Sequence, residues 1–76
     1  MEAFVGQIIL MGGNITPPGF AACNGALLTV RDHMALFFVI GNKHGGDGKT
    51  DFAVPKLTAP EGTFYFIATE GNYPQQ

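Results

Sequence analysis

Charged side chains are scarce in this chain. They make up 13% of its 76 residues, about half of the roughly 25% that is usual in soluble domains. So few charges cannot cover the surface of an isolated domain in the ordinary way. We therefore expect part of the surface to be buried in a larger assembly, a homo-oligomer or a fibre. The alternative is a soluble monomer whose neutral surface is rich in Gly, Asn and Thr.

Basic residues and cysteine are scarcer still. Four Lys and Arg stand against six Asp and Glu, which gives a net charge of -2. No basic stripe is available to neutralise phosphates, and this argues against nucleic-acid binding. The one cysteine, Cys23, has no second thiol with which to form a disulfide or a zinc site. It is predicted to be a small buried hydrophobe.

A basic leader and a long apolar run are also missing. The segment 4–11 is apolar, but Gly6 and Gln7 interrupt it and Gly12 ends it, and no basic residue precedes it. It is too short for a membrane span and lacks the basic start of a signal peptide. We expect a protein that is made in the cytoplasm without a signal peptide and does not insert into a membrane.

The length limits the size of the core. A chain of 8.1 kDa has room for one domain, predicted over residues 1–76. Its accessible surface would fall from about 11,700 Å² unfolded to about 4,500 Å² folded, so only about 60% is buried and the isolated domain is marginal. A two-domain enzyme, a doubly wound nucleotide-binding sheet and a barrel of parallel strands are excluded.

The order of apolar runs and turn residues predicts a mainly β (α+β) fold of short strands and hairpins. Residues 4–11 are predicted to form a strand covered on both faces, and residues 63–69 the clearest strand, rich in aromatic and β-branched side chains. Residues 16–19, Thr-Pro-Pro-Gly, predict a rigid turn. Asn24 and Gly25 lie between two apolar runs and predict a two-residue type I′ hairpin.

One short helix is predicted at about residues 32–40. Asp32 is the expected N-cap and Gly41 the expected residue after the last turn. Residues 41–51 form a glycine-rich polar loop. Residues 52–55 are expected to form a brief extended piece that Pro55 keeps at a sheet edge.

The polar loop ends in Gly48-Lys49-Thr50, which invites a phosphate-binding interpretation. The P-loop pattern needs a glycine five residues before Gly48, where this chain has Lys43, so the spacing fails. Asp47 would also place a carboxylate where phosphates should lie. A long turn that needs several residues with positive φ explains the glycines better.

The same loop holds candidate metal ligands, and its His44 is a candidate partner for Cys23 as a nucleophile. His44 and Asp47 would need His33, Asp32 or Asp51 to complete a metal site, and these spacings match no metal motif. Cys23 with His44 or His33 would lack an activating helix N-terminus and an oxyanion hole. We expect no enzyme activity, no catalytic or metal-binding residue and no cofactor.

Aromatic side chains offer one further binding surface. Seven of them could form a face for sugars, although an aromatic core is the commoner arrangement: Phe20, Phe37, Phe38, Phe52, Phe64, Tyr65 and Phe66.

Five separated motifs follow one another in an order that closely resembles the phage tail collar domain family, found in tail fibre proteins and in bacterial microcystin-dependent-type proteins. They are Val5-Gly6-Gln7-Ile8, residues 18–25 (Pro-Gly-Phe-Ala-Ala-Cys-Asn-Gly), residues 35–37 with Ile40-Gly41, residues 45–48 (Gly-Gly-Asp-Gly) and residues 52–57 (Phe-Ala-Val-Pro-Lys-Leu). The resemblance covers about residues 4–57.

The chain also departs from the family pattern. Phe20, His44 and Lys56 stand where the family usually has Trp, Tyr and Asp. The usual Arg-Gly-Arg segment and the long Gly-rich region that follows it are reduced to residues 58–62. The resemblance therefore implies the family's scaffold without its variable head.

On this basis the chain is expected to be a non-catalytic structural subunit of a phage tail fibre or phage-derived appendage, located in the virion tail or the extracellular appendage. Its expected partner is itself, in a homo-trimer or fibre, with other tail proteins as further candidates. The alternative is a host-surface binding module for a glycan or protein. The assembly or recognition candidates are the loop residues Lys43, His44, Gly45, Gly46, Asp47 and Gly48, the strand residues Ile8, Phe64 and Phe66, and the surface aromatic Tyr73. The first strand, residues 4–11, and the terminal strand, residues 64–68, are the expected sheet edges for this contact.

Overall fold

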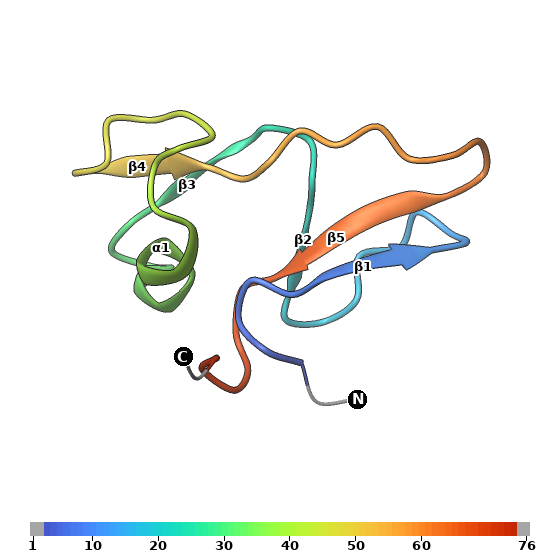
Figure 1. The fold of residues 1–76 in the computed structure, drawn as a ribbon, viewed down its shortest axis with the longest axis horizontal. Coiled ribbons are helices and arrows are strands. Elements are labelled where there is room, and N and C mark those ends of the chain that lie inside the picture. Colours follow the sequence, from blue (N-terminus) through green and yellow to red (C-terminus); the bar gives the residue numbers. More distant parts are fainter. Residues whose placement is uncertain (1–2, 75–76) are drawn as a thin grey trace.

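The computed structural model describes residues 3–74 and consists of two small antiparallel sheets and one short helix (Figure 1). The elements in chain order are β1 (Ile8–Met11), β2 (Phe20–Ala22), β3 (Leu27–Thr29), α1 (Met34–Ile40), β4 (Asp51–Ala53) and β5 (Phe64–Ala68). The predicted mainly β fold with one short helix is confirmed.

The larger sheet has the order β1-β5-β2, so β5 is its central strand. The prediction of a strand near the C-terminus is confirmed, but the expectation that it forms a sheet edge is wrong. Aromatic and β-branched side chains favour a strand but do not by themselves select a central or an edge position. The edge is formed by β1, and the expectation that β1 is covered on both faces is also wrong, because Ile8, Leu10 and Met11 are exposed.

The connection between β1 and β2 crosses the sheet. Both strands are antiparallel to β5 and lie on opposite sides of it, so residues 12–19 must pass over one of its faces. The predicted turn is present in this segment, and the Phe20 N–H donates to the Pro17 carbonyl at 3.1 Å. Thr16 of the crossover and Phe66 of β5 line one groove, and the Phe66 side chain is buried.

The predicted hairpin at Asn24-Gly25 is wrong. The strands on either side of it, β2 and β3, lie in different sheets. Asn24 does not adopt the positive φ that a type I′ turn requires. Its side-chain Oδ1 instead accepts the Ala26 N–H at 3.0 Å, and Asn24 forms an isolated bridge with Lys56. The Asn-Gly pair therefore turns the chain from one sheet to the other.

The helix is confirmed, but its predicted cap is not. The N-cap position of α1 is His33, which makes no side-chain capping bond. Asp32 instead accepts a hydrogen bond from the Thr29 hydroxyl at 2.8 Å. At the other end, the Gly41 N–H donates to the Phe37 carbonyl at 2.7 Å, as expected for a glycine that ends a helix.

The smaller sheet pairs β3 with β4 and supplies the deepest part of the core. Residues 52–55 are all buried. The prediction that this segment lies at a sheet edge holds, because a sheet of two strands has only edge strands. The main apolar cluster joins both sheets and the helix: Val5, Cys23, Leu36, Phe52, Val54 and Ile67. The prediction that Cys23 is buried is confirmed, and Phe52 and Phe66 also lie in the core.

A turn at the start of the chain anchors both ends. The Gln7 N–H donates to the Phe4 carbonyl at 2.9 Å, and Gly6 has φ 87°, as in a type II turn. The Gly6 N–H then reaches the Ala68 carbonyl at 2.9 Å, so the turn leads into a bulge against β5. Only glycine adopts this conformation readily.

The tail is tied to the same end of the molecule. Asn72 donates its N–H to the Ala3 carbonyl at 2.9 Å and accepts the Val5 N–H at 2.8 Å. Figure 1 shows the two ends of the chain lying on the same side of the molecule. Residues 75 and 76, the end of the predicted chain-long domain, lie outside the described residues, as do residues 1 and 2.

Candidate functional site

The predicted loop is confirmed, and residues 41–50 are here named the glycine loop. Its organising group is the carboxylate of Asp47. Asp47 Oδ1 accepts backbone N–H groups from Lys49 and Thr50 at 2.8 Å and from Asp51 at 3.1 Å. The Asp47 N–H in turn donates to Asp51 Oδ1 at 2.9 Å. The loop is therefore closed by one carboxylate that binds successive backbone donors.

These bonds change the acidity of the carboxyl. The backbone N–H of Lys49, followed by those of Asp51 and Thr50, holds the pKa of Asp47 below its ordinary value of 3.8. Hydrogen bonds to the charged form of a carboxyl favour that form. Asp47 Oδ1 is therefore engaged with the backbone of its own loop.

The glycine loop folds back on β4. A Cβ on Gly46 would lie 2.6 Å from the Phe52 Cα and 2.8 Å from the Asp51 carbonyl oxygen, so only a residue without a side chain fits there. The Ala53 N–H donates to the Gly45 carbonyl at 3.0 Å. The glycines of this motif thus have a function within the chain, which is to let the loop approach the strand closely.

The structure brings none of the candidate metal-ligand combinations together in residues 3–74. No group of three His, Cys, Asp or Glu side chains that could hold a metal ion occurs in that range. His44 is exposed on the loop, and His33 lies at the start of α1. Burial raises the pKa of the Cys23 thiol, and a protonated thiol is a poor nucleophile.

The aromatic residues do not form one continuous face. Phe37 packs on Phe52 with ring centroids 5.3 Å apart, and Phe52 and Phe66 are buried. Phe38 is exposed on α1 and Phe64 is exposed on β5. Most of the aromatic area therefore serves the core, and the exposed rings belong to different elements.

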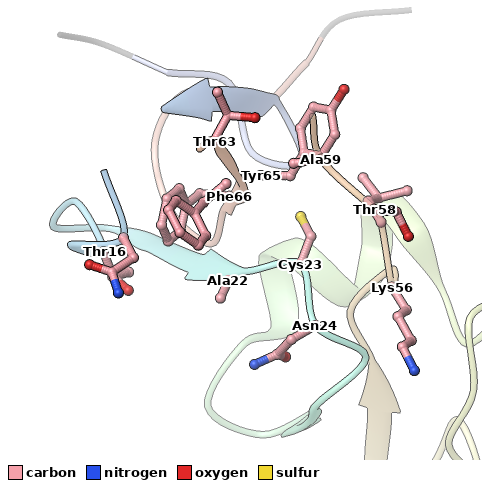
Figure 2. Close-up of a pocket in the computed structure, with 13 residues that line it drawn as sticks. Thr16, Ala22, Cys23, Asn24, Lys56, Thr58, Ala59, Thr63, Tyr65 and Phe66 are labelled. Carbon is pink, nitrogen blue, oxygen red and sulfur yellow. The ribbon is translucent and has the colours of Figure 1, made fainter. Parts of the chain in front are cut away.

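A shallow groove of about 360 Å³ lies beside the start of β5 (Figure 2). The crossover, the β2–β3 link and the segment before β5 each contribute to it. Its walls combine amide, hydroxyl and aromatic groups with one lysine and carry no carboxylate, and its lining is Asn14, Thr16, Ala22, Cys23, Asn24, Lys56, Leu57, Thr58, Ala59, Thr63, Phe64, Tyr65 and Phe66. The sequence pattern did not reveal this groove, because its residues come from separate segments that only the fold brings together.

The predicted assembly residues fall into two groups. Phe66 is 2% exposed on the central strand, so its prediction as a contact residue is wrong: neighbours on both sides of β5 and the crossover cover it. Ile8, Phe64 and Tyr73 are exposed. Ile8 lies on the free edge strand β1 and Phe64 at the start of β5, next to Met11 in the strand register.

Comparison with known proteins identifies the class to which this scaffold belongs. The model of the family described as Phage Tail Collar Domain matches residues 6–61, which is most of the chain. The protein therefore belongs to the phage tail collar domain family, and this membership suggests a structural role in a phage tail fibre. No curated protein and no solved structure matches the chain.

Among residues 3–74, no helix has the length and hydropathy that crossing a membrane would require.

Proposed function

We propose that this chain is a non-catalytic structural subunit of a phage tail fibre or phage-derived appendage, and that it self-associates into a trimer or fibre. The observation that carries the proposal is the family match over residues 6–61. Its place is then the virion tail or the extracellular appendage, with other tail proteins as further partners. Residues 1–76 act as a single collar-type domain in this proposal.

The surface of the chain supports self-association. Large apolar side chains on several elements are exposed, with Ile15 82% and Phe38 68% accessible. Isolated exposed apolar residues are ordinary, but many of them on a chain with few charges are typical of a surface that is covered in an assembly. Ile8 and Phe64 are the proposed strand contacts. Residues 43–48 of the glycine loop are a proposed second contact region.

The mass of the purified chain in solution tests this proposal. Light scattering over a range of concentrations, with electron microscopy of the same samples, should give a mass that is a multiple of 8.1 kDa or visible fibres. A chain that remains a monomer at high concentration, without fibres, would contradict the proposal.

A second candidate function is binding to a host-surface glycan or protein. Two observations favour it: the exposed ring of Tyr73 and the groove lined by hydroxyl, amide and aromatic groups. A glycan-array signal that is lost in Tyr73→Ala or His44→Ala would support this function. An absence of binding to arrays and to whole cells would count against it.

A further inference from the structure

The free edge of the larger sheet is formed by β1, and its unpaired backbone groups can be assigned. The Gln7 carbonyl accepts the Ala68 N–H at 2.9 Å. Backbone groups in an antiparallel pair point alternately toward the partner strand and away from it. The C=O of Gln7 and both backbone groups of Ile9 therefore point toward β5, while the Gln7 N–H is used in the turn with Phe4. The N–H and C=O groups of Ile8 and Leu10 point outward and have no partner strand among the described residues.

This edge lacks charge and proline, two of the features that usually prevent strands from pairing, although β1 is short and a bulge at Gly6 precedes it. Natural edge strands are protected by charges, prolines or a covering segment. Here the sequence has no Asp, Glu, Lys or Arg between residues 3 and 30, and β1 has no proline. The side chains of Ile8 and Leu10 are 42% and 48% exposed. An uncharged, apolar edge favours a partner that is itself uncharged and apolar.

The opposite edge of the same sheet is less available. β2 has three residues, and two prolines lie just before it. The Phe20 N–H already donates to the Pro17 carbonyl at 3.1 Å. A second copy therefore finds fewer free donors on β2 than on β1.

The edges of the smaller sheet are also partly used. The outward groups of β4 are bonded to the glycine loop, since the Asp51 carbonyl accepts the Gly48 N–H at 2.9 Å and the Ala53 N–H donates to Gly45 at 3.0 Å. On β3, the Thr29 carbonyl accepts the His33 N–H at 3.2 Å. β1 is thus the strand whose edge is least used by its own chain.

We propose that β1 pairs in antiparallel orientation with β1 of a second copy of this chain, with the two-fold axis at Ile9. This inference rests on the proposed self-association and names its surface for the fibre, because a two-fold contact between two β1 strands does not build a three-fold trimer. In this register Ile8 lies opposite Leu10 of the second copy, and Leu10 lies opposite Ile8 of the second copy. The outward groups of these residues then form four backbone hydrogen bonds, and the two three-stranded sheets become one sheet.

The side chains fit the same register. The paired Ile8 and Leu10 side chains lie on one face, and the two Ile9 side chains meet on the other, so every central contact is apolar and no like charges meet. The accessible surface of 5094 Å² is about 600 Å² above the roughly 4,500 Å² expected for a monomer of this mass. The chain therefore exposes more surface than a typical monomer of its mass.

Pairing of this kind joins two copies and supplies one of the contacts of a fibre. Growth beyond a pair needs a second surface, because each β1 edge can be used only once. The exposed side of α1, which carries Met34 and Phe38, lies on a different element and stays available for it.

Cysteine cross-linking tests the register directly. Two residues opposite each other at a non-hydrogen-bonded position have Cα atoms about 4.5 Å apart, within the roughly 4.4–6.8 Å that a disulfide spans. Ile9→Cys should therefore give a covalent dimer on mild oxidation. Ile15→Cys, at an exposed position off the edge, is the matched control and should remain largely monomeric under denaturing conditions, as should the unmodified chain with its buried Cys23.

Substitutions at the edge give a second, independent measurement. Ile8→Lys adds charge to the edge, and Leu10→Pro removes an outward N–H without removing a bond to β5. Both should weaken self-association by about tenfold or more, whereas Phe38→Lys should leave the β1-paired dimer intact. Circular dichroism shows whether each variant is folded.

The outcomes separate this proposal from the proposed function. If the unmodified chain is a monomer, both fail. If it assembles but Ile9→Cys does not cross-link, or Ile15→Cys cross-links equally well, the pairing of β1 is overturned and self-association stands. A folded Ile8→Lys variant that assembles normally would overturn the pairing as well.

Discussion

At the scale of single residues, Gly6 and Asp47 determine the path of the backbone in two different ways. Gly6 supplies a positive φ of 87° in the turn that joins the start of the chain to β5, and a Cβ there would lie 2.8 Å from Val39 Cγ1 of α1. Asp47 supplies a carboxylate that binds successive N–H groups. Neither function depends on a partner molecule, so both should appear as stability effects in the isolated chain.

Gly6→Ala should lower the free energy of unfolding by about 1–3 kcal/mol, because alanine at positive φ is strained and its Cβ also meets α1. The matched control is Gly13→Ala, since Gly13 does not have a positive φ and a Cβ there meets nothing within 4 Å. Urea unfolding followed by circular dichroism measures both. Equal stability of the two variants would show that the turn does not require glycine.

Asp47 should make stability depend on acid pH. Because the pKa of Asp47 is lower in the folded chain than its ordinary value of 3.8, the unfolded chain takes up the proton first as the pH falls. The stabilisation is therefore present in full above this ordinary value and is lost as the pH falls through the lower folded value. Unfolding curves between neutral and strongly acid pH should show a smaller loss in Asp47→Asn than in the unmodified chain. An unchanged pH dependence in this variant would contradict the assignment.

At the scale of elements, the position of β5 between β1 and β2 decides how its side chains behave. Phe66 is 2% exposed and Phe64 is 41% exposed, although both lie on the same face of one strand. The difference comes from the position along the strand, since Phe64 is its first residue and Phe66 lies under the crossover. From the sequence, a charge at either position has the same expected effect.

Phe66→Lys should prevent stable folding, whereas Phe64→Lys should be tolerated. An unpaired buried charge costs several kcal/mol, and a chain of this length is stable by only about 4–11 kcal/mol at roughly 0.05–0.15 kcal/mol per residue. Circular dichroism and thermal unfolding of the two variants distinguish these effects. A cooperative transition of normal temperature in Phe66→Lys would show that the side chain is not buried in solution.

At the scale of the whole molecule, charge is distributed unevenly along the chain. Residues 3–30 form β1, the crossover, β2 and β3 and carry no charge, and from residue 31 onward the chain holds all four basic residues. The strand β5 is also free of charged residues. All three strands of the larger sheet are therefore uncharged, and its edge strand β1 exposes apolar side chains. The surface most suited to self-association is the one with the least charge.

Stability should rise with protein concentration if copies associate through this sheet. Association stabilises the folded chain by mass action, so the thermal midpoint of the unmodified chain should increase over about a hundredfold range of concentration. Ile8→Lys, with its edge charged, should show a much smaller increase. A midpoint that does not change with concentration in either protein would argue against association of the folded chain.

The local pattern of residues was sufficient to predict the mainly β class, the short helix, the Pro-Gly turn, the glycine-rich loop and the last strand. These features depend on the backbone preferences of residues that are close together in the chain, and those preferences follow from the residue types. The ordered motifs also indicated the collar family. The same local reasoning predicted a hairpin at Asn24-Gly25 and a cap at Asp32, and both predictions are wrong. Asn24 forms a bridge with the distant Lys56, and Asp32 accepts a hydrogen bond from Thr29, three residues earlier in the chain.

The sequence by itself determined which segments are extended, where the chain turns, and that this protein is poor in charge. Only the tertiary structure decided which strand is central and which is free. Strand order depends on pairing between segments distant in the chain, and β1 and β5 have similar apolar composition, so composition cannot rank them. The crossover places β5 in the centre, buries Phe66 and leaves Ile8 and Leu10 at the edge, and for this reason the proposed contact surface follows from the fold.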